Sequence, residues 1–218
     1  MSRYKIVLID LDGTLTDSSP GIFNAVRYGL NRIGHPIPPE ETLIKFIGPP
    51  LIESFAVHCN LTGERAEQAL DAYREYYREK GLFENAVYDG IPEALERLKG
   101  AGLMLALATS KPEEFSVRIM ERFGLDKYFD TMAGASLDVT RATKQKVIEY
   151  ALKLLKVSDP SEAIMVGDRH HDVEGAAVHG IRCIGVTYGY GSAEELLGAG
   201  AMCVAATPAE VADIILGS

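Results

Sequence analysis

The feature that most constrains the fold is a short apolar run followed at once by two carboxylates. Residues 6–9 read Ile-Val-Leu-Ile, and residues 10–14 read Asp-Leu-Asp-Gly-Thr. Four apolar residues, mostly β-branched, are typical of a central parallel strand that is covered on both faces. In open α/β sheets the carboxyl ends of such strands face the crevice where ligands bind. We therefore expect Asp10 and Asp12 to lie at a ligand-binding edge.

The alternation of side chains along a strand would point Asp10 and Asp12 toward the same side. Two neighbouring carboxylates disfavour each other's ionisation unless a cation lies between them. Mg²⁺ is a suitable cation, because it prefers oxygen ligands and accepts only a few from protein. The plainer alternative is an Asp-Gly turn with solvated acids.

Composition places the chain among ordinary globular proteins. It has 218 residues, of which 47% are hydrophobic and 24% charged, which is typical of folded domains. No apolar run approaches the roughly 20 residues that span a bilayer, so we expect no membrane partner and a cytoplasmic location. The net charge of -9 argues against a nucleic-acid partner. Three widely spaced cysteines, without a CxxC pattern, predict buried reduced thiols.

Residues 20–80 read as helices interrupted by Pro and Gly. Apolar spacing predicts helices over 20–34, 39–46, 51–60 and 62–80, and no convincing strand. Thr62 is a candidate N-cap for the last of them, as Ser18 or Ser19 is for the first. We therefore predict a helical bundle, residues 17–87, inserted after the first strand.

From residue 91 helices and strands alternate. The predicted helices are 91–100, 112–123, 143–156, 173–179, 193–198 and 208–216, and the predicted strands are 103–108, 128–133, 163–166, 182–186 and 202–205. Such alternation indicates parallel strands joined by right-handed crossovers, with helices on both faces. The fold class is therefore α/β, a doubly wound parallel-sheet core (residues 1–16 and 88–218, Rossmann-like) with the inserted helical bundle.

Polar groups follow two of the later strands or begin a helix. Thr109 and Ser110 come after strand 103–108, where one hydroxyl could cap a helix and the other face an anion. Lys144 begins a predicted helix, where its charge opposes the helix dipole. A solvated surface lysine is the plainer interpretation of Lys144.

The strand 163–166 ends in Gly-Asp-Arg-His-His-Asp, residues 167–172. Asp168 and Asp172 are one helical turn apart, and we expect them to join Asp10 and Asp12. The two histidines suggest zinc, but an all-carboxylate neighbourhood suits Mg²⁺ better, so they are predicted to be loop residues. Gly-Tyr-Gly at 189–191 is predicted to be a turn.

Together these motifs resemble those of the haloacid dehalogenase (HAD) superfamily. The four are Asp-x-Asp-Gly-Thr, Thr-Ser at a strand end, a lysine, and Gly-Asp-x-x-x-Asp, in this order on these elements. The inserted helices resemble the C1-type cap of that superfamily. The text Thr-Ser-Lys-Pro at 109–112 and Ile-Gly-Pro-Pro at 47–50 is most similar to the phosphoglycolate phosphatase-like and 5'-nucleotidase-like members.

The resemblance implies roles for the four acids. Asp10 would be the nucleophile that forms an aspartyl-phosphate, and Asp12 the general acid and then the base. Mg²⁺ would be held by Asp10, the backbone carbonyl of Asp12, and Asp168. Asp172 would be either a ligand or an anchor for the others.

The resemblance also implies substrate-binding residues. Thr109, Ser110 and Lys144 would bind the phosphate oxygens, and the loop 45–50, with Lys45, would contact the leaving group. The expected activity is Mg²⁺-dependent hydrolysis of a small phosphorylated metabolite by a monomer or homodimer.

Two alternatives stay open at this point. One is a phosphomutase of the β-phosphoglucomutase kind, and the other is a non-enzymatic phosphate-binding protein. The substrate also stays open among phosphoglycolate, a nucleoside monophosphate, a sugar phosphate and a phosphotyrosine-like ester.

Overall fold

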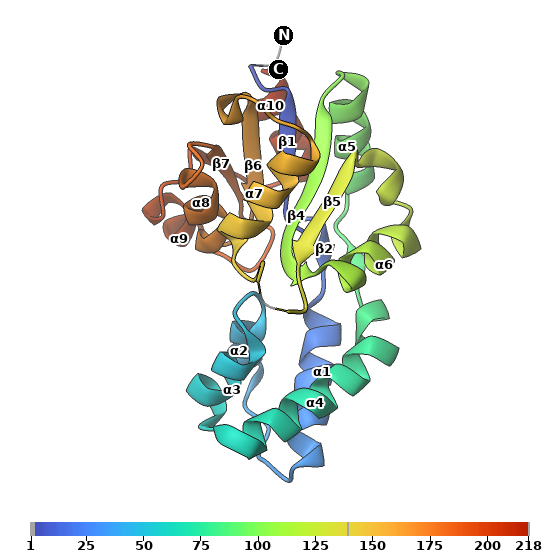
Figure 1. Ribbon diagram of the computed structural model, residues 1–218, viewed down its shortest axis with the longest axis vertical. Helices are drawn as coiled ribbons and strands as arrows, with labels where there is room; N and C mark the ends of the chain where they lie inside the picture. Colours follow the sequence, from blue (N-terminus) through green and yellow to red (C-terminus); the bar gives the residue numbers. More distant parts are fainter. Residues whose placement is uncertain (1–2, 139, 218) are drawn as a thin grey trace. The chain divides into compact units, whose positions relative to one another are not determined.

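The computed structural model describes residues 3–138 and 140–217 (Figure 1). The chain divides into two units. The first comprises Met1–Thr16 and Val87–Ser218, and the second comprises Asp17–Ala86. The chain passes between them at two short strands, β2 (Thr16–Asp17) and β3 (Ala86–Val87), which pair with each other.

The first unit is built on a six-stranded sheet with the order β5-β4-β1-β6-β7-β8. Every pair of neighbouring strands is parallel. The predicted doubly wound α/β fold is thereby confirmed. The strands are β1 (Ile6–Ile9), β4 (Met104–Pro112), β5 (Thr131–Ala135), β6 (Ala163–Gly167), β7 (Arg182–Val186) and β8 (Cys203–Ala205).

Helices cover both faces of this sheet because its strands are apolar on both sides. Leu8 belongs to a buried cluster with Val147 of α7 and Val173 of α8. Ile9, the next residue but facing the other way, lines a small pocket with Leu95 of α5 (Ile91–Gly100). In Figure 1, α7 passes in front of the sheet. The helices are α5 (Ile91–Gly100), α6 (Glu113–Phe123), α7 (Lys144–Leu154), α8 (His170–Ala177), α9 (Ala193–Gly198) and α10 (Pro208–Leu216), with short 3-10 turns η3 (Asp126–Tyr128) and η4 (Pro160–Glu162).

Strand β1 lies at the centre of the sheet, between β4 and β6. Its last residue, Ile9, is level with Leu107 of β4 and Val166 of β6. The strand order reverses at this point, which in open α/β sheets opens a crevice at the carboxyl ends. The residues that follow these three strands are therefore brought to one place.

The second unit is helical, and none of residues 20–80 lies in a strand, as predicted. Aromatic pairs fill its core: Phe46 packs edge-on against Phe55 with ring centroids 5.3 Å apart, and Tyr73 stacks on Tyr77 at 5.5 Å. Its helices are α1 (Ser19–Arg32), α2 (Glu40–Leu43), η1 (Ile44–Phe46), α3 (Leu51–Cys59), α4 (Gly63–Glu79) and η2 (Gly81–Phe83). Within the described ranges of both units, no helix is long and apolar enough to cross a membrane.

The structure corrects several local predictions. Strand β4 continues to Pro112, which is the N-cap of α6, so the expected capping of that helix by Thr109 or Ser110 is wrong. Helix α8 begins at His170, so the two histidines are helical and not loop residues. Cys203 is half-buried, whereas Cys59 and Cys183 are buried free thiols as predicted.

Candidate active site

A buried ammonium group joins two of the predicted site carboxylates. Nζ of Lys144 lies 2.7 Å from Oδ1 of Asp10 and 2.7 Å from Oδ1 of Asp172. It also donates to the carbonyl oxygen of Ala108 at 2.9 Å. These contacts use the three donors of a lysine ammonium group, which is what a buried charge requires. Lys144 is therefore not the solvated surface residue that the plainer interpretation expected.

Asp168, at the end of β6, completes a cluster of three carboxylates. One carboxylate oxygen from each of Asp10, Asp168 and Asp172 lies within 4.8 Å of the others. Oδ2 of Asp168 accepts the backbone N–H of Tyr190 at 2.8 Å. Its Oδ1 is buried, and no hydrogen-bond partner for it is present among the described residues. The cluster thus contains three carboxyl groups, and one ammonium group, that of Lys144, is in contact with two of them.

Burial, together with the neighbouring charges, shifts the pKa values of the acids. Burial raises the pKa of Asp10 to about 6, against the opposing pull of Lys144 and with a further increase from Asp172. Burial, with Asp172 and Asp10 nearby, also holds the pKa of Asp168 well above its usual range. Although burial alone lowers the pKa of Lys144, Asp10 and Asp172 raise it above its ordinary value. Lys144 therefore stays charged, whereas ionisation of Asp10 and Asp168 is disfavoured unless a further cation is bound.

The donor set fits a hard divalent cation. All three clustered side chains offer oxygen, and the buried Oδ1 of Asp168 has the lone pairs that a metal would use. The two oxygens of Asp172 are different, since Oδ1 pairs with Lys144 and Oδ2 accepts the backbone N–H of Arg169 at 3.1 Å. Both oxygens of Asp172 thus have protein partners, whereas Oδ1 of Asp168 has none among the described residues.

Two glycines allow the loops to close around these acids. A Cβ on Gly13, whose φ is +83°, would lie 2.1 Å from Oδ2 of Asp168. A Cβ on Gly167 would lie 2.2 Å from Cγ of Asp172. At Gly167 the space that a side chain would fill is therefore occupied by the side chain of Asp172.

Asp12 has a partner that the sequence analysis missed. Nζ of Lys111 lies 2.8 and 2.6 Å from the two carboxylate oxygens of Asp12. The side chain of Lys111 is 6% exposed and that of Asp12 is 17% exposed. The only sequence signal was the position of Lys111 beside Thr109 and Ser110, in the polar cluster after an apolar strand.

The remaining predicted residues lie at the end of β4. Thr109 is buried, and its Oγ1 accepts the backbone N–H of Lys111 at 3.2 Å. Ser110 is half-buried and, within the described residues, makes no hydrogen bond to the carboxylate cluster. Thr109 is therefore built into the strand end, whereas Ser110 is not tied to the acids.

Another hollow, of about 560 Å³, lies in the second unit and is larger than the small pocket beside Ile9 in the first. Residues 35–38, 58–62 and 65 line it. No acidic side chain is among them, so it lacks the opposed charges that mark the carboxylate cluster.

Residues 7–186 match the family described as haloacid dehalogenase-like hydrolase. A 5'-nucleotidase of Pseudomonas aeruginosa is 44% identical over 194 residues, covering 89% of this chain and 87% of its own length. A crystal structure titled as that of a predicted phosphatase from Clostridium acetobutylicum has a TM-score of 0.91 and 47% identity, over 99% of both chains.

A relative with another name is equally similar in sequence. The tyrosine-protein kinase PtkA of Mycobacterium tuberculosis is 44% identical over 190 residues, which are 87% of this chain but only 64% of the kinase. A phosphoglycolate phosphatase of Pseudomonas savastanoi is 33% identical over 85% of this chain and 70% of its own length. The family match, the parallel sheet and the relatives named as phosphatases or nucleotidase agree: the chain belongs to the haloacid dehalogenase-like hydrolases and is an enzyme of their phosphatase class.

Proposed function

We propose that the protein is a Mg²⁺-dependent phosphatase that hydrolyses a small phosphomonoester through an aspartyl-phosphate on Asp10. The observation that carries the proposal is the environment of Asp10. This buried carboxylate pairs with Lys144 and is clustered with an Asp168 oxygen that has no partner in the described part of the chain. A buried nucleophile beside a fixed cation suits attack on an anionic phosphate.

In the first step, a carboxylate oxygen of Asp10 attacks the phosphorus atom. The bond between phosphorus and the ester oxygen breaks, and the leaving alkoxide takes a proton from Asp12. Lys144, held between Asp10 and Asp172 at 2.7 Å from each, keeps a positive charge beside the transferring group. A charge fixed in advance costs no reorganisation when the transition state forms.

In the second step, water attacks the phosphorus atom of the aspartyl-phosphate. Asp12 takes a proton from this water, the bond between phosphorus and the Asp10 oxygen breaks, and inorganic phosphate leaves. Lys111 pairs with both oxygens of Asp12, which supports a fixed position for this residue in both steps. A carboxylate held in this way is kept in one orientation.

Asp10, Asp168 and the backbone carbonyl of Asp12 would hold Mg²⁺, which supplies charge neutralisation when bound. We assign Asp172 the role of anchor for Lys144, because both of its oxygens already have partners. The unpartnered Oδ1 of Asp168 supports its assignment as a ligand.

For the substrate, we propose that Thr109, Ser110 and Lys144 bind the phosphate oxygens. The second unit would act as a cap that selects the leaving group, with Lys45 as a contact. The names of the relatives support two substrate classes, nucleoside monophosphates and phosphoglycolate-like acids.

The test is release of inorganic phosphate from a panel of nucleoside monophosphates, phosphoglycolate, sugar phosphates and phosphotyrosine, with Mg²⁺ or with EDTA. We expect release only with Mg²⁺, and none from Asp10→Asn. Asp138→Asn, which alters an exposed acid of the same unit, is the matched control and should keep wild-type activity.

Other outcomes would point elsewhere. Transfer of the phosphoryl group from a sugar bisphosphate to a sugar, without release to water, would replace the phosphatase by a mutase. Mg²⁺-dependent transfer from ATP to a tyrosine side chain, without ester hydrolysis, would replace it by a kinase. Turnover by Asp10→Asn equal to that of the wild type would contradict the nucleophile itself.

A further inference from the structure

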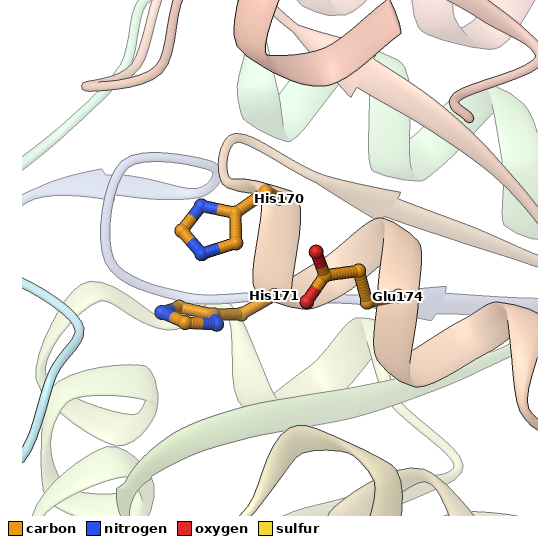
Figure 2. A group of neighbouring side chains, drawn as sticks. All are labelled: His170, His171 and Glu174. Atoms are coloured by element: carbon orange, nitrogen blue, oxygen red, sulfur yellow. The ribbon is translucent and has the colours of Figure 1, made fainter. Parts of the chain in front are cut away.

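A second group of metal-ligating side chains lies on the first turns of α8. His170, His171 and Glu174 each offer one ligand atom, and these atoms lie within 4.8 Å of one another. His171 and Glu174 are exposed and His170 is half-buried. Figure 2 shows the two rings and the carboxylate around a shared space on one side of the helix. Spacings of three and four residues place Glu174 on the same helix face as both histidines.

The ring of His170 is held in a defined orientation by Glu195. Nδ1 of His170 lies 2.8 Å from Oε1 of Glu195, which also accepts the backbone N–H of His170 at 3.0 Å and Nε of Arg169 at 2.9 Å. Because an ionised carboxylate only accepts, Nδ1 carries the proton, and in the neutral ring Nε2 keeps its lone pair. A carboxylate behind a histidine in this way is the usual support of a metal-binding imidazole.

The second imidazole lies directly against the first. The ring centroids of His170 and His171 are 3.8 Å apart and their planes are inclined by 45°. In Figure 2 one nitrogen of His170 points toward the ring of His171, and Glu174 directs its carboxylate to the same side. Two imidazole nitrogens and one carboxylate oxygen are thus close to one another.

We propose that His170, His171 and Glu174 bind a divalent first-row transition metal ion, with Zn²⁺ as the occupant. Two nitrogens and one oxygen suit zinc, with water as the fourth ligand, whereas Mg²⁺ prefers oxygen alone. Bonds of about 2.0–2.1 Å in a tetrahedron require ligand atoms about 3.3 Å apart. Side-chain rotations of His171 and Glu174, both exposed, bring the atoms together from within 4.8 Å.

The position of this site on α8 gives it a connection to the carboxylate cluster. Asp172, the residue after His171, accepts the backbone N–H of Arg169 and pairs with Lys144. A metal bound to His170 and His171 fixes the same helical turn that holds Asp172. The two sites nevertheless differ in ligand chemistry, which lets an experiment separate them.

The test is calorimetric titration of the full-length protein with Zn²⁺ in the presence of excess Mg²⁺. We expect one zinc ion per chain in the wild type, and a weakening of at least tenfold in His171→Ala and in Glu174→Gln. His179→Ala is the matched control: His179 is also in the described part of the first unit, but it bonds the carbonyl oxygen of Gln145, and its loss should leave zinc binding unchanged. Glu195→Ala should weaken zinc by about 10- to 100-fold, the usual effect of removing a supporting carboxylate.

A second measurement identifies the ligands directly. In proton–nitrogen NMR spectra, added Zn²⁺ should shift the ring nitrogens of His170 and His171 but not those of His179. Binding of zinc with equal affinity in wild type and His171→Ala would overturn the proposal, as would zinc that is displaced by Mg²⁺ or lost in Asp168→Asn alone. Equal shifts of all histidines would also overturn the proposal, since they would show that zinc binds non-specifically.

Discussion

At the scale of single residues, the pair of Lys111 and Asp12 is the contact with the most direct consequence for activity. Lys111 bonds both oxygens of Asp12, and both side chains are largely buried. Bonds of this kind between charged groups contribute about 1.5–3 kcal/mol each. Asp12 in turn is the proposed acid and base, so its orientation affects both chemical steps.

Replacement of Lys111 by Met should therefore lower kcat/KM by roughly 10- to 100-fold, which corresponds to about 1.4–2.7 kcal/mol. The reason is that the Asp12 carboxylate would lose its fixed partner and rotate away from the reacting oxygen. Steady-state kinetics on the best ester of the panel measures the effect.

Lys99→Met is the matched control for this substitution. Lys99 also pairs with an aspartate of the first unit, Asp130, at 2.8 Å, but both side chains are about one-third exposed. Its loss should leave kcat/KM within twofold of the wild type, because exposed pairs contribute little. Equal activities of the Lys111 and Lys99 variants would show that Lys111 does not position Asp12.

The positions of the site acids could be predicted from the sequence, but their hydrogen bonds and ion pairs could not. Asp10, Asp12 and Asp168 could be located because each follows an apolar strand whose carboxyl end is recognisable. The partner of Asp12 could not, because the reach of Lys111 depends on the register of β4 beside β1, 99 residues away in sequence. The backbone N–H of Tyr190, which bonds Asp168, leaves no pattern in the side-chain sequence at all.

At the scale of elements, the turn after β1 depends on the absence of a side chain at Gly13. Its φ of +83° is unfavourable for other residues, and a Cβ there would overlap Oδ2 of Asp168. Gly13→Ala should therefore displace Asp168 as well as strain the backbone. We expect a loss of activity of about 100-fold or more, since a displacement of about 1 Å suffices for such losses. We also expect a higher Mg²⁺ concentration to be needed for half-maximal activity.

Gly102→Ala is the control that separates the effect of backbone strain from the effect of displacing Asp168. Gly102 has nearly the same φ, +82°, but nothing lies within 4 Å of the position of its Cβ. Both variants should lose about 1–2 kcal/mol of unfolding free energy from the left-handed conformation, and only Gly13→Ala should also lose activity. Urea denaturation and phosphatase assays on both proteins measure the two effects. Full activity in Gly13→Ala would contradict the assignment of Asp168 to the active site.

The elements with an apolar repeat were predictable, and the two-residue strands β2 and β3 were not. Helices α9 and α10 and the central strands lie where apolar periodicity placed them, because burial repeats over several residues. Strands β2 and β3 have two residues each and leave no such repeat. The extension of β4 to Pro112 accompanies a register shift after Ala108 against β5, and that irregularity depends on the neighbouring strand, which local sequence does not describe.

At the scale of the whole molecule, the carboxylate cluster links stability to pH and to metal. The folded-state pKa of Asp10 is about 6, above the ordinary value of 3.8 for an aspartate. Between these values the folded protein binds more protons than the unfolded chain, so the contribution of Asp10 to stability falls as pH rises from about 4 to 6. The shift corresponds to roughly 3 kcal/mol at most. A divalent cation that binds the ionised acids should offset this loss.

We therefore expect the free energy of unfolding of metal-free protein, relative to Asp10→Asn, to fall by roughly 1–3 kcal/mol between pH 4 and pH 7. Asp138→Asn provides a control of opposite sign: hydrogen bonds from Ser136 and Thr140 lower the pKa of Asp138 to about 2, so its stabilisation is present at neutral pH and lost on acidification. Urea denaturation at several pH values, with EDTA and with Mg²⁺, measures the free energy of unfolding of the wild type, Asp10→Asn and Asp138→Asn. Because only the folded state holds the cluster together, Mg²⁺ should stabilise the wild type most at pH 7 and least at pH 4. A metal effect independent of pH, or equally large in Asp168→Asn, would show that the cation binds outside the cluster.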